Sequence, residues 1–433
     1  EAGSDLPLVV RMNALDYVDG GLTQEDSLWL ALQLSSFEVD ALSVTSGTMC
    51  ETPPFCLYPA GTPKAHLLPM AARIRKATSL PVIVAGRIRS PEVAREALSH
   101  GDTDFVGLGR PLLADPDWVR KAASGDDEAI VLCAACHQGC LGELRKGNGT
   151  HCLFDPVTGR ESQVEVLPAA EPRRIVVIGG GPAGLEAARI AAERGHEVSL
   201  YEGSHHLGGQ LSLAARAPHK EGFLDVIRSM EILARRAGAH IHLDTPVSPE
   251  DLADPRPDAV VLATGSIPFP SAFPGLETTP WALASEILAG EVPVQGSPVL
   301  VVGGGLVGLE TADFLGEQGR SVVLVEMRPE VGAGLDPLPR TMLMKRLEEH
   351  GVEIHTDTRI TALRPGRASG KARDRSIEID FGFLVLAVGA KANRDLAQRL
   401  EKTGLSVHLV GDAVEPRGAG EAIWEGFQVA NRL

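Results

Sequence analysis

The sequence predicts an α/β protein in which a run of βα units is followed by two dinucleotide-binding folds. Short apolar segments alternate with amphipathic stretches over residues 1–125, and two glycine-rich fingerprints of the same design follow later in the chain. The 433 residues have room for two or three domains, and a hydrophobic content of 44% is that of ordinary globular cores.

Composition excludes several classes of partner. The net charge of −16 argues against a nucleic acid or an anionic membrane, because either would need a basic face. No apolar run approaches the roughly 18 residues of a membrane span. Six cysteines, four of them clustered, do not resemble a disulfide framework and indicate a reducing compartment such as the cytoplasm.

Four strands are predicted in the first region, at Leu8–Met12, Asp40–Val44, Pro81–Ala85 and Asp104–Leu108. A capping-box pattern from Thr23 to Asp26 opens a helix after the first of them. Such βα units in series predict a parallel sheet, but four strands do not close a barrel.

Two of these strands end in a glycine followed by an arginine, Gly86-Arg87 and Gly109-Arg110. Glycine lets the backbone approach a phosphate, and arginine adds charged donors. A single turn of this kind is more often an ordinary loop with a surface arginine. Two in succession at corresponding places favour a phosphate site, which (β/α)₈ barrels commonly form at their last two strands.

Four cysteines, Cys133, Cys136, Cys140 and Cys152, lie in one loop and linker that we assign to residues 126–168. Thiolates in this pattern suit either tetrahedral zinc or an iron–sulfur cluster, and their spacing does not decide between the two. Nucleotide-binding regions on both sides favour a [4Fe–4S] cluster, because a one-electron carrier has a use there.

Each fingerprint combines a strand, a glycine-rich turn, a helix and an acid that follows the first glycine by the same number of residues. The predicted nucleotide-binding residues are Gly179, Gly181, Gly184 and Glu202 in the first copy, and Gly303, Gly305, Gly308 and Glu326 in the second. The glycines permit a tight turn and close approach to a pyrophosphate, and the acid can accept from a ribose hydroxyl. One such motif is weak evidence, whereas two in the same context are strong.

The arrangement is similar to reductases with two dinucleotide folds, in which the first fold binds FAD and the second NAD(P). By that resemblance Gly209, Gln210 and Asp412 would also contact FAD, and Gly389 would lie at the nicotinamide site. The FAD domain would then span residues 169–290 and 385–433, and the NAD(P)H domain would be inserted at 291–384.

Further motifs resemble the second half of the old yellow enzyme barrel: Val10–Met12, Asp16–Thr23, Pro81–Arg87 and Gly109–Asp115. With the cysteine loop and two nucleotide folds, the chain resembles the iron–sulfur flavoenzyme family of 2,4-dienoyl-CoA reductase, 2-enoate reductase and trimethylamine dehydrogenase. The resemblance implies that the first region, residues 1–125, supplies strands five to eight of a TIM barrel. Arg11 would contact the FMN pyrimidine edge, and Gly86, Arg87, Gly109 and Arg110 would hold its phosphate.

The sequence departs from this family in two ways. The family's first four βα units are missing, so we expect the other half of the barrel from upstream sequence or from a partner chain, and an oligomer is possible. Where dienoyl-CoA reductases place a histidine acid, this chain has Cys50. A thiol is a poorer acid than an imidazolium, and Cys50 could instead line a pocket as an apolar residue.

These features predict a flavoenzyme that passes electrons from NADH or NADPH through FAD and a [4Fe–4S] cluster to FMN, which reduces an activated C=C bond of a small molecule such as an enoate, enone or enoyl-CoA. Glu326 favours NADH, although Arg328 could offset a 2′-phosphate. The alternatives are an amine dehydrogenase that passes electrons to an electron-transfer flavoprotein, and an electron-transfer subunit without its own FMN.

Overall fold

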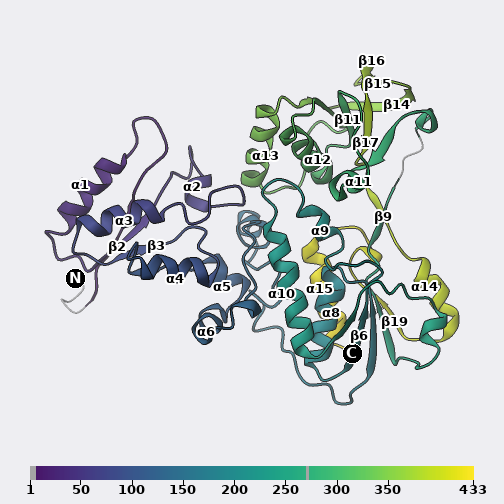
Figure 1. Ribbon diagram of the computed structural model, residues 1–433, viewed down its shortest axis with the longest axis horizontal. Helices are drawn as coiled ribbons and strands as arrows, with labels where there is room; N and C mark the ends of the chain where they lie inside the picture. The colour runs from purple at the N-terminus through teal and green to yellow at the C-terminus, as the bar shows by residue number, and fades with distance from the viewer. Residues whose placement is uncertain (1–5, 270–272) are drawn as a thin grey trace. The chain divides into compact units, whose positions relative to one another are not determined.

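The computed structural model describes residues 6–269 and 273–433, so the first five residues of the predicted barrel region lie outside it. The chain divides into two compact units, Glu1–His137 and Gln138–Leu433 (Figure 1). The division falls inside the predicted cysteine loop, between its second and third cysteines.

The first unit is built from βα repeats around one parallel sheet of order β1-β2-β3-β4. Its main elements are β1 (Val9–Asn13), α1 (Gln24–Leu34), β2 (Ala41–Thr45), α2 (Pro54–Leu57), α3 (Leu68–Ala77), β3 (Val82–Val84), α4 (Pro91–Ser99), β4 (Phe105–Val106), α5 (Arg110–Ala114) and α6 (Trp118–Ser124). The four predicted strands are present, and the capping box from Thr23 to Asp26 is confirmed at the start of α1.

Burial differs between the middle and the edges of this sheet. Leu42 on β2 and Val82 on β3 are fully buried, because central strands of a parallel sheet are covered on both faces. At the edges, Val9 on β1 is 47% exposed and Phe105 on β4 is 56% exposed. Both edge strands of the sheet are therefore exposed, as expected for four strands that do not close a barrel.

The second unit contains two parallel sheets. The first has the order β19-β8-β5-β6-β7. We call it, with its helices, the first fold: β5 (Arg174–Ile178), α8 (Pro182–Glu193), β6 (Glu197–Tyr201), α9 (Gln210–Ala214), α10 (Gly222–Ala237), β7 (His240–His242), β8 (Ala259–Leu262), α14 (Asp395–Leu400), β19 (Val407–Leu409) and α15 (Ala419–Ala430). Helices α10 and α15 both pack against α8, which follows the first fingerprint.

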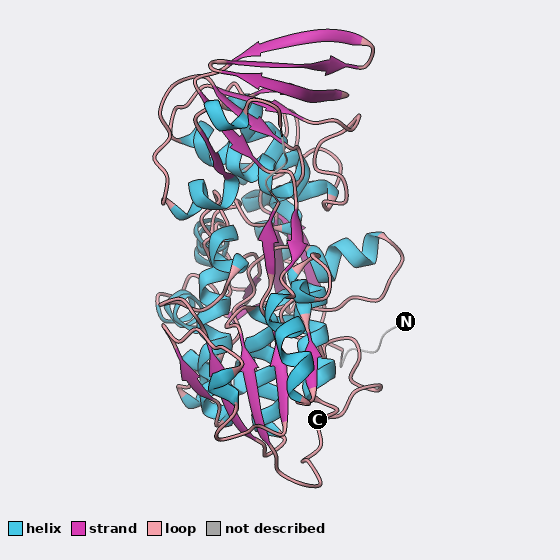
Figure 2. Cartoon of the chain, turned by 90° about the vertical axis from the view of Figure 1, so that its right-hand side faces the viewer, coloured by secondary structure: helices cyan, strands magenta, loops and turns pink. Residues whose placement is uncertain are grey.

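The second sheet has the order β10-β17-β11-β12-β13. The second fold comprises β10 (Trp281–Leu283), α11 (Ala284–Ala289), β11 (Val299–Val302), α12 (Leu306–Glu317), β12 (Val322–Val325), α13 (Pro337–Glu349), β13 (Glu353–His355) and β17 (Phe383–Leu386). An antiparallel sheet of β14 (Thr358–Arg364), β15 (Arg367–Ala372) and β16 (Arg375–Asp380) lies at the top of Figure 2, and the first fold lies at the bottom.

The chain passes between these two folds twice, and the two passages pair as an antiparallel ribbon. Strand β9 (Ser266–Pro268) leaves the first fold and β18 (Ala390–Ala392) returns to it, with Lys391 opposite Ile267. Among the helices that the structure describes, none combines the length and the apolar character needed to cross a bilayer.

Candidate functional site

The first fingerprint forms a tight turn between β5 and α8 that only glycine can make. Gly179 has φ of +108°, and a Cβ there would lie 2.3 Å from the Ala263 carbonyl oxygen. A Cβ on Gly184 would lie 1.9 Å from the Gly179 oxygen. At Gly181, by contrast, a Cβ would meet no protein atom within 4 Å, so space is left there for a group outside the protein. This is where a pyrophosphate approaches the backbone in dinucleotide-binding turns.

Glu202 follows β6 and is held rigidly beside this turn. Its Oε2 accepts from the Gly180 amide at 2.6 Å. Its Oε1 accepts from the Ser204 amide at 2.8 Å and from the Ser204 hydroxyl at 2.9 Å. Each carboxylate oxygen has a further lone pair, so the carboxylate can also accept from a ribose hydroxyl. We call this turn together with Glu202 the first cradle.

A second group of polar side chains gathers in the first fold from three distant segments. The Gln210 amide donates to the Ser266 hydroxyl at 2.6 Å and to Asp412 Oδ2 at 3.3 Å, and the Ser266 hydroxyl donates to the same oxygen at 3.0 Å. Gly209, with φ of +51°, brings this segment against Gly181 of the cradle. The structure thus brings together Gln210 and Asp412, which are both predicted FAD contacts, and adds Ser266, which carries no motif.

The second fingerprint repeats the first turn almost atom for atom. Gly303 has φ of +112°, and its Cβ would lie 2.3 Å from the Ala387 oxygen. A Cβ on Gly308 would lie 1.8 Å from the Gly303 oxygen, whereas Gly305 again faces open space. Gly389, with φ of +104°, also faces open space just after β17. The residues present therefore fit a second dinucleotide.

Glu326 lies beside the second turn as Glu202 lies beside the first, and we call the second turn together with Glu326 the second cradle. Its Oε2 accepts from the Gly304 amide at 2.6 Å and its Oε1 from the Arg328 amide at 2.8 Å. The Glu326 side chain is buried, while that of Arg328 is exposed to solvent. The Glu326 carboxylate is thus held in place beside the turn by two backbone amides.

In the first unit, both Gly-Arg turns open onto one pocket of about 140 Å³. Its walls are Tyr58, Ala85, Gly86, Arg87, Ile88, Arg89, Gly107, Gly109, Arg110, Pro111, Cys133 and Ala135. Gly86 has φ of +121° and Arg87 has φ of +52°, so the backbone turns sharply here. A Cβ on Gly109 would meet open space. Close backbone access and two guanidinium groups suit a phosphate, as predicted for FMN.

Both arginines are anchored by backbone carbonyls or a ring nitrogen. Arg87 donates to the Thr62 carbonyl. Arg110 donates to the Tyr58 carbonyl at 2.9 Å, and its Nη1 lies 2.7 Å from His137 Nε2. These contacts fix the positions of both guanidinium groups, each of which carries five donors.

Arg11 projects from β1, and its Nη2 lies 3.5 Å from the Thr45 hydroxyl at the end of β2. That hydroxyl also lies 3.3 Å from the Tyr58 hydroxyl. Arg11 is the third residue of five in β1, and its side chain reaches Thr45 at the carboxyl end of β2, the end of the sheet at which barrel enzymes build their sites. This is compatible with the predicted contact to the FMN ring.

An aromatic cluster that sequence reasoning missed is formed by the segment between β1 and α1 and the segment between β2 and α3. Tyr17 stacks on Phe55 with ring centroids 3.9 Å apart, and His66 lies 5.2 Å from the Tyr58 ring. Burial raises the pKa of Tyr17 and lowers the pKa of His66, so both rings are neutral near neutral pH. Only 4% of the chain is aromatic, and several such residues in two loops were the available signal.

Cys50 lies in the loop between β2 and α2 and is exposed to solvent. Cys56 is half-buried, with its sulfur 3.4 Å from the Thr48 carbonyl oxygen, and burial raises its pKa. Cys56 lies on α2, so the two neighbouring thiols differ in surroundings, and of the two Cys50 is the exposed one.

The first two cysteines of the predicted cluster lie at the end of the first unit. Ala135 donates its amide to Cys133 Sγ at 3.4 Å, and Arg89 donates to the Cys133 carbonyl at 3.4 Å. Amide donors to sulfur tune iron–sulfur clusters, so the donor chemistry fits. Ala135 and His137 both have positive φ, of +55° and +63°, and shape the loop around Cys136.

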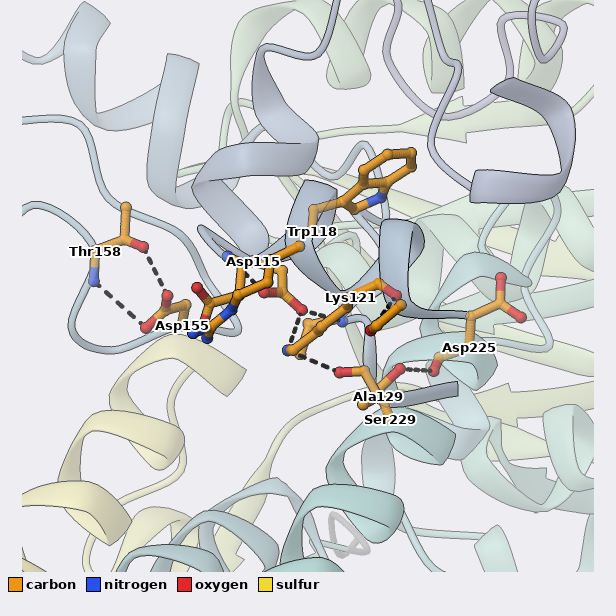
Figure 3. Close-up of polar contacts among 12 residues, drawn as sticks. Asp115, Trp118, Lys121, Ala129, Asp155, Thr158, Asp225 and Ser229 are labelled. Carbon is orange, nitrogen blue, oxygen red and sulfur yellow. Dashed lines mark hydrogen bonds and ion pairs between the residues drawn. The ribbon is translucent and has the colours of Figure 1, made fainter. Parts of the chain in front are cut away.

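The segment that leads into this loop is anchored by Asp115, whose side chain is 3% exposed (Figure 3). It accepts from Lys121 at 2.6 Å and from the Val131 amide at 2.9 Å. Lys121 also donates to the Ala129 carbonyl at 2.9 Å. The path from α5 to Cys133 is therefore fixed by a buried ion pair.

The other two cysteines lie in the second unit, where Cys140 belongs to a π-helical turn, Gln138–Gly142. A Cβ on Gly139 would lie 2.9 Å from the Leu153 amide, so this turn packs directly on the segment around Cys152. The Phe154 amide donates to Cys152 Sγ at 3.4 Å. Across the described residues, no three Cys, His, Asp or Glu side chains are arranged to hold a metal ion, so the four-cysteine set remains a prediction.

Known proteins resemble both regions of the chain. Residues 1–128 match the NADH:flavin oxidoreductase / NADH oxidase family, and residues 173–414 match pyridine nucleotide-disulphide oxidoreductases. The chain is 36% identical to an NADH oxidase of Thermoanaerobacter brockii over 435 residues, which cover 99% of this chain and 67% of that protein. It is 31% identical to a cinnamate reductase of Clostridium sporogenes over 86% of this chain and 56% of that protein.

The solved structure of 2-naphthoyl-CoA reductase with 2-naphthoyl-CoA superposes on all of this chain with a TM-score of 0.94 and 28% identity, and this chain covers 66% of it. The chain thus spans about two thirds of the length of several relatives. The matches confirm the expected flavin and nicotinamide cofactors and support the iron–sulfur cluster. The chain belongs to the 2,4-dienoyl-CoA reductase-like family of iron–sulfur flavin oxidoreductases.

Proposed function

We propose that the protein is an NAD(P)H-dependent flavin oxidoreductase that reduces an activated C=C bond in an enoate, an enone or an enoyl thioester. The observation that carries the proposal is the pocket of the first unit, which is lined by both Gly-Arg turns and by Cys133. The residues predicted to hold a phosphate and a predicted cluster ligand thereby line one pocket. Relatives named for cinnamate and 2-naphthoyl-CoA reduction support this substrate class.

When bound, the nicotinamide supplies a hydride, the flavins exchange one or two electrons, and the cluster carries single electrons. The protein supplies position. The second cradle holds the nicotinamide dinucleotide and the first holds FAD, each by backbone amides and a fixed carboxylate. The flavin part of FAD would be held by Gln210, Ser266 and Asp412. Arg87 and Arg110 would hold the FMN phosphate, and Cys133, Cys136, Cys140 and Cys152 the cluster.

This proposal divides the chain into a half barrel at residues 1–125, a cysteine loop and linker at 126–168, a FAD domain at 169–290 and 385–433, and an NAD(P)H domain at 291–384. The exposed edges at Val9 and Phe105 support a barrel that four further βα units complete, supplied by another segment or by a partner chain.

We also propose the accessible thiol of Cys50 as proton donor to the substrate.

The test is anaerobic assay of the protein with its barrel completed, using cinnamate and an aromatic enoyl thioester as acceptors and NADH as donor. We expect bound FAD, FMN, iron and sulfide, and consumption of NADH that depends on the acceptor. Cys50→Ala should slow acceptor reduction and leave reduction of FAD unchanged. Bound zinc without iron would overturn the proposal. So would oxidation of a tertiary amine with transfer of the electrons to an electron-transfer flavoprotein, in place of reduction of a C=C bond.

A further inference from the structure

A buried ion pair joins the two folds of the second unit. Lys220 lies in the turn between α9 and α10 of the first fold, and its Nζ donates to Glu310 Oε1 on α12 of the second fold. The Glu310 side chain is 6% exposed and that of Lys220 is 23% exposed. His219, with φ of +64°, turns the chain just before the lysine. The carboxylate is therefore buried, and the lysine that pairs with it is partly buried.

Glu310 depends on Lys220 to remain ionised in its buried surroundings. Burial raises the pKa of Glu310, and the nearby Lys220 opposes this by favouring the ionised form. On the same helix, Asp313 is fully buried and pairs with Arg346 of α13 at 2.7 Å, with His350 Nε2 3.6 Å away. Helix α12 thus carries two buried acids, of which one is neutralised within its own fold and the other by the neighbouring fold.

Such a pair is a poor source of stability. Removing two charges from water costs about as much free energy as their attraction returns, and well-packed apolar residues are often equally good. A buried pair does, however, demand a particular geometry, because a displaced partner leaves an uncompensated charge. Lys220 and Glu310 therefore provide a defined placement of one fold on the other.

That placement concerns the segments that carry the two nucleotides. Helix α12 begins directly after Gly305 of the second cradle, and α9 begins at Gln210, beside Ser266 and Asp412. Helix α9 also packs against α11 of the second fold (Figure 1). Lys220 follows α9 by a short turn, so the ion pair fixes the start of the nicotinamide helix relative to the far end of the FAD site.

We propose that Lys220 and Glu310 are a positioning pair that aligns the nicotinamide with the flavin for hydride transfer. The inference rests on the proposed function in that it assigns FAD to the first cradle and the nicotinamide to the second. A misplacement of about 1 Å is enough to lower a transfer rate by about a hundredfold. The pair therefore acts on the rate of flavin reduction rather than on the binding of either nucleotide.

The test compares two apolar replacements in the holoenzyme. Lys220→Met with Glu310→Leu removes the pair between the folds, and Arg346→Met with Asp313→Leu removes the matched pair within the second fold. Stopped-flow absorbance measures flavin reduction at saturating NADH and the apparent Kd for NADH. Hydrogen exchange of β9 and β18 measures the mobility of the ribbon that links the folds without any cofactor chemistry.

We expect the Lys220/Glu310 double variant to keep its flavin, to be reduced normally by dithionite, and to be reduced by NADH about ten- to a hundredfold more slowly with little change in Kd. Exchange in β9 and β18 should accelerate. The Arg346/Asp313 variant should match the parent in both readouts. Lys220→Arg, which keeps the charge, should retain most of the rate and serves as a second variant if the apolar pair does not fold.

A double variant with the parental reduction rate and parental exchange would overturn the inference. If the parent itself is not reduced by NADH or NADPH, the proposed function fails, and the exchange measurement still decides whether the pair fixes the folds.

Discussion

The first and second folds hold their nucleotide loops with equivalent atoms. In each, the amide after the first glycine donates to the acid at 2.6 Å, and the residue two after the acid donates at 2.8 Å. The two folds differ in the side chain of that last residue. Ser204 binds Glu202 through its hydroxyl as well, whereas the Arg328 side chain is exposed. The backbone therefore sets the cradle that the two folds share, and the two cradles differ in the side chain two residues after the acid.

The largest expected effect comes from adding a methyl group to a glycine in the turn of either cradle. Gly184→Ala and Gly308→Ala each place a methyl group less than 2 Å from a backbone oxygen, which the helix can relieve only by moving. We expect each to cost about 4 kcal/mol or more in its own fold. Gly184→Ala should abolish FAD binding. Gly308→Ala should keep FAD and lose reduction by NADH, as measured by flavin content and stopped-flow absorbance. Loss of FAD in both variants would show that the two cradles are not independent.

The next effect concerns nucleotide choice. Glu326 would repel a 2′-phosphate at close range, a contribution on the order of a kcal/mol or more, so the parent should favour NADH about tenfold or more in kcat/KM. Glu326→Ala should reduce that preference. Glu202→Ala, the matched change in the first fold, should lower FAD content instead. A parent that prefers NADPH, or an unchanged preference in Glu326→Ala, would contradict this role.

Arg328→Ala should have a small effect, because the side chain is exposed. We expect less than about a twofold change in kcat/KM with NADH and with NADPH. Steady-state rates with both nucleotides check this. A tenfold loss confined to NADPH would mean that the guanidinium binds the 2′-phosphate, and would reverse the assignment to NADH.

The smallest expected effect is a difference between the two folds in how their stability depends on pH. His196, at the turn before β6, is buried, and its Nδ1 accepts from the Arg173 amide at 3.1 Å. Burial, followed by the charges of Arg194 and Arg173, lowers the pKa of His196. A depressed histidine pKa gives stability that is present above its usual value of about 6.5 and is lost as the pH falls through the folded value.

Melting temperatures measured across this range should therefore fall with acid in the parent and fall less in His196→Asn, whose side-chain oxygen can still accept from the amide. The corresponding turn of the second fold has Arg320 in place of a histidine. Equal acid sensitivity in the parent and the variant would assign the loss to other groups.

The parts of the site that are local in sequence were predictable. The glycine spacing predicted both turns because each is made by consecutive residues, and the capping box at Thr23 was predicted for the same reason. Strand positions were predicted to within a few residues: Asp104–Leu108 was expected where β4 covers Phe105–Val106. Such boundaries depend on pairing with neighbouring strands.

The parts made by distant segments were not predictable. Ser266 joins Gln210 and Asp412 only after three segments have folded together, and Lys220 meets Glu310 across two folds. Neither lysine nor serine at these positions belongs to a motif. Whether Cys133, Cys136, Cys140 and Cys152 bind one cluster is also a question of tertiary placement, which their spacing alone does not answer.

The most direct test of electron transfer through the cysteine loop is anaerobic titration of the purified protein with NADH, followed by flavin absorbance and by electron paramagnetic resonance. We predict that NADH bleaches bound FAD and that a reduced iron–sulfur signal appears as the titration proceeds, with iron and sulfide matching one [4Fe–4S] cluster per chain. Protein that binds FAD and is bleached by NADH, but contains zinc and gives no such signal, would contradict this role of the cysteine loop.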